Sequence, residues 1–227
     1  MTGTGFADLL ARRRSVRAYL PTPVPAAVVA QILTDARRAP SGANLQPGGF
    51  VALTGAPFVA LKATLAEGIA QGRPTVSEYD YFPDPMPARL KDRQRAAGFG
   101  LYAALDIDRR DRAGRRAQFA RNYAFFDAPV GIVVTIDRAM GKGCWMDLGM
   151  ALMALFLSAE ARGLSTTGIG ALAHYADLVH TGLDLPADQM VVCGIALGHA
   201  DPAAPVNGFR TDRAALADYA QLRGFDA

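Results

Sequence analysis

Two runs of the sequence are apolar at nearly every position: VGIVVTI at 130–136 and MVVCGIALG at 190–198. A strand with one face in water alternates apolar and polar residues, so a continuous apolar run indicates a strand that is covered on both faces. GFVALT at 49–54 is a shorter segment that also predicts a strand. These segments predict a sheet that is buried between other elements.

Helical patterns occupy much of the remaining sequence. Predicted helices cover residues 6–10, 25–39, 57–72 and 148–162. Pro25 suits the first turn of the second helix, Pro40 ends it, and Asp147 is the expected N-cap of the last one. Because helices outnumber strands and interrupt them irregularly, we expect an α+β fold, organised as a single domain over residues 1–227.

The charge balance argues against a nucleic-acid partner. The chain carries 24 Lys and Arg against 21 Asp and Glu, a formal net charge of +3. Its densest basic stretch, RRDRAGRR at 109–116, has aspartates within and before it, which favours a solvated helix face. A DNA- or RNA-binding domain built on this stretch is the less favoured alternative.

Cysteine content and hydropathy bear on the compartment. Cys144 and Cys193 form no C-x-x-C pair, so they indicate neither a disulfide framework nor a zinc site, and a cytoplasmic location is expected. Residues 1–15 lack the layout of a secretory signal. The apolar stretch 148–159 is shorter than the roughly 20 residues that span a bilayer core. We therefore expect a buried helix and no membrane association.

Several catalytic chemistries lack their motifs. The histidines, His174, His180 and His199, form no H-E-x-x-H or similar metal-ligand spacing, so no metal site is expected. The sequence contains neither a G-x-S-x-G nucleophile elbow nor a G-x-x-x-x-G-K-[ST] phosphate loop. Hydrolase and P-loop chemistry are therefore not indicated.

One segment, GIGALA at 168–173, matches the dinucleotide-binding pattern G-x-G-x-x-A. That motif requires a strand before it and a helix that starts at its third conserved position. Here a predicted helix ends just before the motif, at 162–164. We therefore interpret 168–173 as a flexible loop and not as part of a Rossmann fold.

Two polar segments each allow two interpretations. RAPSGANLQPGGF at 38–50 is either a turn from a helix into a strand or a loop that holds a ligand. RRSVR at 13–17 places three guanidinium groups and a hydroxyl within five residues. It is either a solvated basic turn or a site for an anion such as phosphate, whose oxygens match the planar guanidinium fork. The residues alone leave both questions open.

In their order along the chain, these segments resemble the FMN-dependent nitroreductase family. Residues 13–55 resemble its opening: an R-R-S-x-R start, a helix, and A-P-S-x-x-N-x-Q-P before a strand. Residues 119–172 and 185–216 resemble the middle and end of the branch that reduces nitrobenzoates. The resemblance implies a nitroreductase-like fold with a central mixed sheet flanked by helices, in an intertwined homodimer.

The resemblance also implies a noncovalent FMN site built from both subunits. Its expected residues are Arg13, Arg14, Ser15 and Arg17 along the phosphate, ribityl chain and N1 side of the ring; Pro40, Ser41, Gly42 and Asn44 from the other subunit, with Gln46 close behind; Gly168, Ile169 and Gly170 beside the flavin N5 edge; and Arg210 at the phosphate, with Arg213 as a weaker candidate. No catalytic side chain is implied, because the flavin carries the chemistry.

The implied activity is the reduction of nitroaromatic or quinone-like substrates by NADH or NADPH. The nicotinamide gives hydride to flavin N5 and leaves, and the acceptor then takes its place, which is a ping-pong scheme. Asn122, Tyr123, Phe125 and Phe126 correspond to a segment that lines the substrate side in relatives, or they are core residues.

Two departures from the nitrobenzoate branch qualify these expectations. Gly48 stands where that branch has Trp, and STTGIG at 165–170 stands where it has S-T-C-P-Q. A wider or more mobile flavin pocket is therefore expected. The alternatives are a flavin-binding protein with little turnover, or other flavin chemistry on the same fold, such as dehalogenation or ring fragmentation.

Overall fold

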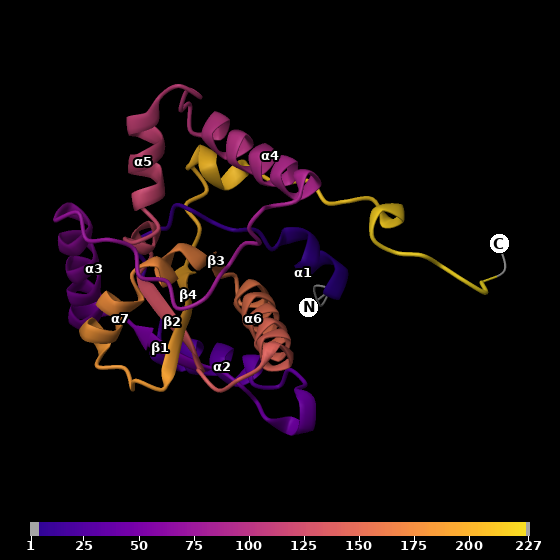
Figure 1. Ribbon diagram of the computed structural model, residues 1–227, viewed down its shortest axis with the longest axis horizontal. Helices are drawn as coiled ribbons and strands as arrows, with labels where there is room; N and C mark the ends of the chain where they lie inside the picture. Colours follow the sequence, from indigo (N-terminus) through magenta and orange to yellow (C-terminus); the bar gives the residue numbers. More distant parts are fainter. Residues whose placement is uncertain (1–4, 226–227) are drawn as a thin grey trace.

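The computed structural model describes residues 5–225, and its centre is a four-stranded sheet (Figure 1). The strands are β1 (Gly49–Leu53), β2 (Val130–Asp137), β3 (Ser165–Ile169) and β4 (Gln189–Gly198), in the order β1-β2-β4-β3. All three strand pairs are antiparallel, so the expectation of a mixed sheet is wrong in this respect. Within the described residues, parallel pairing to these strands is limited to an isolated bridge between Ser15 and Thr166.

Both faces of the sheet are covered, as the continuous apolar runs predicted. Every residue of β2 from Val130 to Ile136 is buried. On one face the strands pack against Phe58, Leu61 and Leu65 of α3 (Gly55–Ala70) and against α7 (Ala176–Leu183). On the other face they pack against α2 (Ala26–Ala36) and α6 (Lys142–Ala161), as Figure 1 shows. The chain is therefore α+β with helices on both sides of one sheet.

The remaining helices complete the elements. These are α1 (Phe6–Arg12), α4 (Ala88–Ala104), α5 (Arg112–Ala120) and the 3₁₀ turns η1 (Gly42–Asn44), η2 (Phe125–Asp127), η3 (Gly170–His174), η4 (Pro205–Gly208) and η5 (Leu216–Asp218). The basic stretch 109–116 does enter a helix, because the Asp111 side chain caps α5 by accepting from the Gly114 N–H at 2.8 Å.

Helix α6 differs from the sequence-based expectation in length and in its cap. It begins at Lys142, after the N-cap Gly141, so Asp147 lies inside the helix and is not its cap. With 20 residues, α6 is long and apolar enough to cross a membrane by length and composition alone. It instead packs along the sheet with Leu148 and Leu155 in the core. Its other side exposes Met146 and Met150.

The stretch between α3 and α4 covers the part of β4 that extends beyond β3. The Tyr79 hydroxyl donates to the Val192 carbonyl at 2.6 Å, and the Glu78 carboxylate accepts from the Val191 N–H at 2.7 Å. These side chains satisfy backbone groups that lie beyond the β3–β4 pairing register. The aromatic and proline-rich segment at 77–87 is thus anchored to the sheet at its start.

Helices α4 and α5 form an arm that stands above the sheet (Figure 1). No residue of α4 is buried, and Gln118 alone is buried in α5. The C-terminal segment after η4 projects away from the sheet, and its apolar side chains Leu216, Tyr219, Leu222 and Phe225 are 55% to 75% exposed.

Candidate functional site

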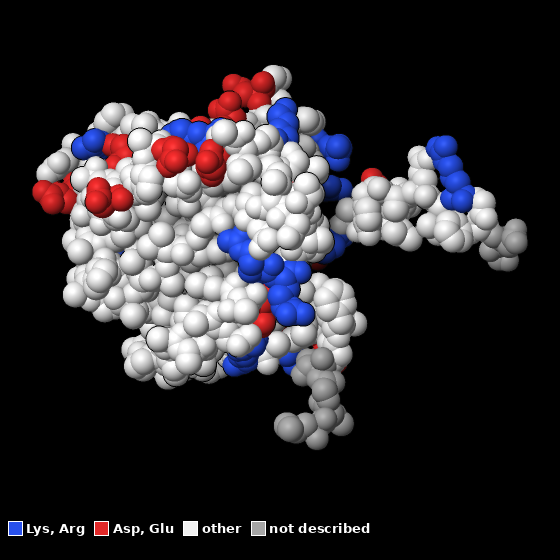
Figure 2. All heavy atoms as spheres, turned by 90° about the horizontal axis from the view of Figure 1, so that it is seen from below, with Lys and Arg blue, Asp and Glu red and all other residues white. Residues whose placement is uncertain are grey.

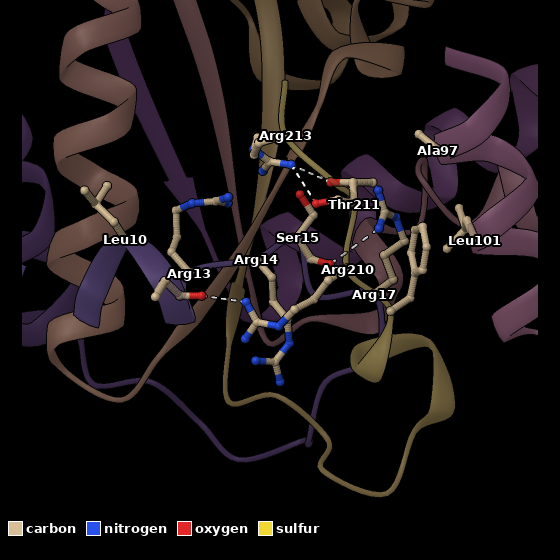
Figure 3. Close-up of a pocket in the computed structure, with 12 residues that line it drawn as sticks. Leu10, Arg13, Arg14, Ser15, Arg17, Ala97, Leu101, Arg210, Thr211 and Arg213 are labelled. Carbon is tan, nitrogen blue, oxygen red and sulfur yellow. Dashed lines mark hydrogen bonds between the residues drawn. The ribbon is translucent and has the colours of Figure 1, made fainter. Parts of the chain in front are cut away.

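Arginine side chains gather around a cavity of about 300 Å³ between the end of α1, α4 and the segment after η4 (Figure 3). Its walls are Leu10, Ala11, Arg13, Arg14, Ser15, Arg17, Ala97, Leu101, Phe209, Arg210, Thr211 and Arg213. All four residues expected from RRSVR are here, together with Arg210 and the weaker candidate Arg213. The structure therefore brings together two segments that lie almost 200 residues apart. We call this space the arginine cavity.

The RRSVR segment is held in place by the edge of the sheet. The Val16 N–H donates to the Thr166 carbonyl of β3 at 3.2 Å, and the Thr167 hydroxyl donates to the Val16 carbonyl. The Arg17 N–H donates at 2.9 Å to the side chain of Asn207, which is only 3% exposed. Because hydrogen bonds to β3 and to Asn207 hold its backbone, this segment forms an ordered wall of the arginine cavity and not a solvated turn.

The arginine cavity carries unbalanced positive charge. Burial, then the charge of Arg213 and to a smaller extent that of Arg210, lower the pKa of Arg13 against the opposing charge of Glu160, and burial lowers the pKa of Arg17. Among residues 5–225, the buried Nε of Arg14 has no hydrogen-bond partner. Arg210 donates from Nη1 to the Ala11 carbonyl at 2.5 Å, at the end of α1. An anion with several oxygens would satisfy the free donor and relieve the repulsion.

A second expected group of residues, on the loop from Pro40 to Gly48, is shaped by Arg37. Its guanidinium donates to the Gln46 carbonyl, to the Pro47 carbonyl at 3.2 Å and to the Gly48 carbonyl at 2.7 Å. The loop needs this support because Ala43, Asn44, Gln46 and Gly48 have positive φ angles. The Ser41 hydroxyl accepts a hydrogen bond from the Gln46 N–H. In this conformation the side chains of Asn44 and Gln46 are exposed at the surface.

Helix α6 keeps these two groups apart within one chain. Near its N-terminal end, Asp147 accepts from the Gly42 N–H at 3.1 Å. Near its C-terminal end, Glu160 pairs with Arg12 at 3.3 Å, next to the arginine cavity. At about 1.5 Å per residue, the helix between these two contacts is about 20 Å long. Pro40, Ser41, Gly42, Asn44 and Gln46 therefore do not line the arginine cavity of their own chain.

The segment that was interpreted as a flexible loop is ordered. Gly168 and Ile169 end β3, and Gly170 begins η3, so the loop interpretation of 168–173 is wrong. The strand was missed because STTGI has no apolar run; its pairing with β4 defines it. A Rossmann motif remains excluded, since β3 is antiparallel to its neighbour and leads into a 3₁₀ turn.

Gly170 borders an aromatic hollow of about 340 Å³ that sequence reasoning did not identify. Its lining is Ser77, Tyr79, Asp80, Tyr81, Phe82, Phe119, Gly170, Ala171, Ala173 and His174. A Cβ at Gly170 would lie 2.9 Å from the Tyr81 ring, so glycine lets the ring approach the backbone. The aromatic residues Tyr79, Tyr81 and Phe82 were the signal in the sequence that could have indicated it.

The four residues proposed for the substrate side lie elsewhere. Tyr123, Phe125 and Phe126 are 7%, 0% and 1% exposed and belong to the hydrophobic core, so the core interpretation applies to them. Asn122 is partly exposed and donates to the Phe119 carbonyl at 2.7 Å. Phe119 is 45% exposed and lines the aromatic hollow instead. Within residues 5–225, no group of three or more His, Cys, Asp or Glu side chains could hold a metal ion.

Comparison with known proteins connects this geometry to one family. The model of the Nitroreductase family matches residues 10–199, a range that includes the RRSVR segment at 13–17 and the loop from Pro40 to Gly48. The chain belongs to the nitroreductase family. Among its relatives, the 4-nitrobenzoate reductase of Pseudomonas putida is 39% identical, over 97% of this chain and 96% of that protein. The chloronitrobenzene nitroreductase of Comamonas testosteroni is 36% identical, over 93% and 94%.

Solved nitroreductase structures share the whole fold. The FMN- and NADPH-dependent nitroreductase NfnB from Sphigopyxis sp. strain HMH is 40% identical, with a TM-score of 0.94 over 96% of this chain and 99% of that one. The FMN-dependent NfnB from Mycobacterium smegmatis, solved in complex with NADPH, has a TM-score of 0.90 at 28% identity, over 95% and 96%. The nitroreductase-like fold expected from the sequence is confirmed.

Proposed function

We propose that this protein is an FMN-dependent oxidoreductase that uses NADPH or NADH to reduce nitroaromatic or quinone-like compounds. The observation that carries the proposal is the arginine cavity, where a buried Arg14 donor has no partner within the described part of the chain and positive charges lie close together. The relatives named above reduce nitrobenzoate and chloronitrobenzene, and the related structures depend on FMN and NADPH. These relatives support this activity over the alternatives of a flavin-binding protein with little turnover, dehalogenation or ring fragmentation.

The residues of the arginine cavity fit the phosphate end of FMN. A phosphate monoester carries close to two negative charges and several acceptor oxygens at neutral pH, which suits a group of guanidinium forks. Arg13, Arg14 and Arg210 would hold this phosphate, with Arg213 beside them, and Ser15 and Arg17 would follow along the ribityl chain. Gly168, Ile169 and Gly170 would offer backbone next to the ring, since Ser15 is bridged to the same strand.

Bound FMN supplies two-electron transfer from a reduced nicotinamide to an acceptor molecule, so no side-chain nucleophile is needed. The side chains of the protein would instead position positive charge close to the flavin. Arg17 is largely desolvated, with a lowered pKa, so its cation interacts strongly with any negative charge that develops nearby. The aromatic hollow beside Gly170 can stack a planar ring and exclude water from it.

We further propose a homodimer in which each site is shared. Asn44 and its loop lie at one end of α6 and the arginine cavity at the other, so a site that uses both groups must take the loop from a partner chain. Several exposed apolar side chains fit a second copy: Phe6, Leu10, Met146, Met150, Tyr219 and Leu222. Figure 2 shows a broad part of one face without charged side chains. A two-fold axis would produce two equivalent sites.

The absorbance spectrum of the purified protein tests the activity. We expect a yellow protein that releases FMN, and not FAD, on denaturation, and that is bleached by NADPH without oxygen. Arg14→Glu should lose the flavin and remain folded, because it places a like charge against the phosphate. Arg110→Glu, an exposed charge reversal outside the cavity, is the matched control. Full flavin occupancy in Arg14→Glu would show that the phosphate lies elsewhere.

Mixed dimers test the shared site. Chains that carry Arg14→Ala and chains that carry Asn44→Ala are dissociated together and reassembled. If the site is shared, one site of each mixed dimer combines intact Arg14 with intact Asn44, and activity returns. If both residues serve the same site from one chain, every site stays damaged and no activity is recovered.

Two broader assignments belong to this proposal. Residues 1–227 act as one functional unit, since both cores lie on the same sheet. A cytoplasmic location is consistent with the free thiols of Cys144 and Cys193.

A further inference from the structure

A second group of arginines lines a hollow of about 600 Å³ on the arm formed by α4 and α5. Its lining is Tyr102, Arg112, Arg115, Arg116 and Phe119. Arg112, Arg115 and Arg116 share one side of α5 because residues three and four apart lie next to each other on a helix. They also lie in its first turns, where the helix dipole favours an anion. We call this space the arm hollow.

The guanidinium groups of the arm hollow are not equally free. Arg115 is engaged, since its Nη1 donates to the Arg109 carbonyl at 2.7 Å and its Cζ lies 5.5 Å from the centre of the Tyr102 ring. Among residues 5–225, Arg112 and Arg116 have no ion pair and no side-chain hydrogen bond. Both are exposed. The hollow therefore offers two free guanidinium groups beside two aromatic rings.

The arm hollow adjoins the aromatic hollow and has helix α4 in common with the arginine cavity. Phe119 lines the arm hollow and also the aromatic hollow beside Gly170. On α4, Leu101 lines the arginine cavity and the next residue, Tyr102, lines the arm hollow. A ligand that places a planar ring near Gly170 can thus pass Phe119 and extend to Arg112 and Arg116.

We infer that the arm hollow binds the adenosine 2′-phosphate of NADPH, with Arg112 and Arg116 on the phosphate and Tyr102 or Phe119 against the adenine. This inference rests on the proposed function, because it concerns the electron donor of the same site. NADH has no 2′-phosphate, so NADPH is the preferred electron donor. Two guanidinium forks match a phosphate dianion, and the aromatic walls suit a purine.

The size and charge of the hollow favour this ligand over the carboxylate of a nitrobenzoate. A carboxylate carries one negative charge and would leave one of the two guanidinium groups unpaired. It also needs little space, whereas a hollow of about 600 Å³ is within the range of pockets that hold nucleotide-sized ligands. The carboxylate is therefore the alternative that the experiment must distinguish.

The test uses the flavin-loaded protein and the double variant Arg112→Gln/Arg116→Gln. Calorimetry gives the Kd of adenosine 2′,5′-bisphosphate, and kinetics gives the ratio of kcat/KM for NADPH to that for NADH. In the double variant we expect the Kd for the bisphosphate to rise, and the NADPH-to-NADH ratio of kcat/KM to fall, by about tenfold or more. The reason is that the variant loses charge-assisted hydrogen bonds to the phosphate. Arg110→Gln, on the same arm but outside the hollow, should change neither value.

Three results bear on the interpretation. An unchanged Kd and an unchanged donor ratio in the double variant would overturn the inference. A higher KM for 4-nitrobenzoate, with an unaltered donor ratio and an unaltered KM for nitrobenzene, would overturn it in favour of the carboxylate. If neither donor bleaches the flavin of the wild-type protein, the proposed function fails, and bisphosphate binding still decides whether the arm hollow is a phosphate site.

Discussion

The substitution Gly48→Ala tests why this chain has glycine where the resemblance to the nitrobenzoate branch led us to expect tryptophan. Gly48 has a φ of +90°, and a Cβ added there would lie 2.6 Å from Cδ1 of Leu148 and 3.3 Å from the Thr135 carbonyl oxygen. Leu148 is 1% exposed, so its side chain has little room to move. The position thus faces the core, and glycine is required there both by the backbone and by the packing.

The expected loss of stability has two parts. A left-handed backbone conformation costs a residue with a Cβ about 1–2 kcal/mol. Overpacking a filled core costs typically about 1–3 kcal/mol more. The free energy of unfolding should therefore fall by about 2–5 kcal/mol, and Tm by about 10 °C, since each kcal/mol lowers Tm by roughly 2–4 °C in a chain of this size.

Gly163→Ala is the matched control, because Gly163 has a φ of +71° and nothing within 4 Å of its added Cβ. It should lose only the backbone part, about 1–2 kcal/mol. Urea unfolding followed by circular dichroism, at fixed protein and FMN concentrations, measures both variants. A loss in Gly48→Ala no larger than in Gly163→Ala would refute the overlap with Leu148.

Two further predictions concern the loop and the pH dependence. Arg37→Ala should raise the Kd for FMN several-fold, because the loop from Pro40 to Gly48 loses the hydrogen bonds that Arg37 donates to its carbonyl groups. Arg37→Lys should restore part of the affinity. Fluorescence of released FMN measures the affinity of each protein, and equal affinities in the wild type and both variants would contradict the prediction. Burial raises the pKa of Cys193 from 9.0, and that of Tyr123 from 10.0, to about 12 in each case. The folded state therefore keeps protons that the unfolded state releases, and the free energy of unfolding should decrease as pH rises from 9 toward 12. Urea unfolding at pH 8 and pH 10.5 measures this decrease. An equal or higher free energy of unfolding at pH 10.5 would contradict the prediction.

The features that sequence alone predicted are those with a local signal. The continuous apolar runs predicted β2 and β4, and the apolar stripe between Pro25 and Pro40 predicted α2. The arginines of RRSVR were singled out because like charges so close together need solvent or a counter-ion, and the structure places them around one cavity. Such signals depend on residue type and spacing, which a sequence contains directly.

The features that were missed depend on contacts between distant segments. The strand β3 is defined by its pairing with β4, and the role of Asp147 is to hold the N–H of Gly42, far away in sequence. The start of α6 has no side-chain cap at Gly141, so no local pattern marked it. Phe125 and Phe126 look the same in a pocket or a core until the neighbouring elements are placed.

The arm of α4 and α5 has a consequence for how this enzyme can change over time. The sheet and its covering helices carry nearly all of the buried side chains, whereas the arm contributes only Gln118. Substitutions on the arm therefore avoid the cavity and overpacking penalties that purge most changes in a core. A lineage can alter residues of the arm while the sheet and its covering helices stay constant, so acquiring a new substrate does not require a new fold.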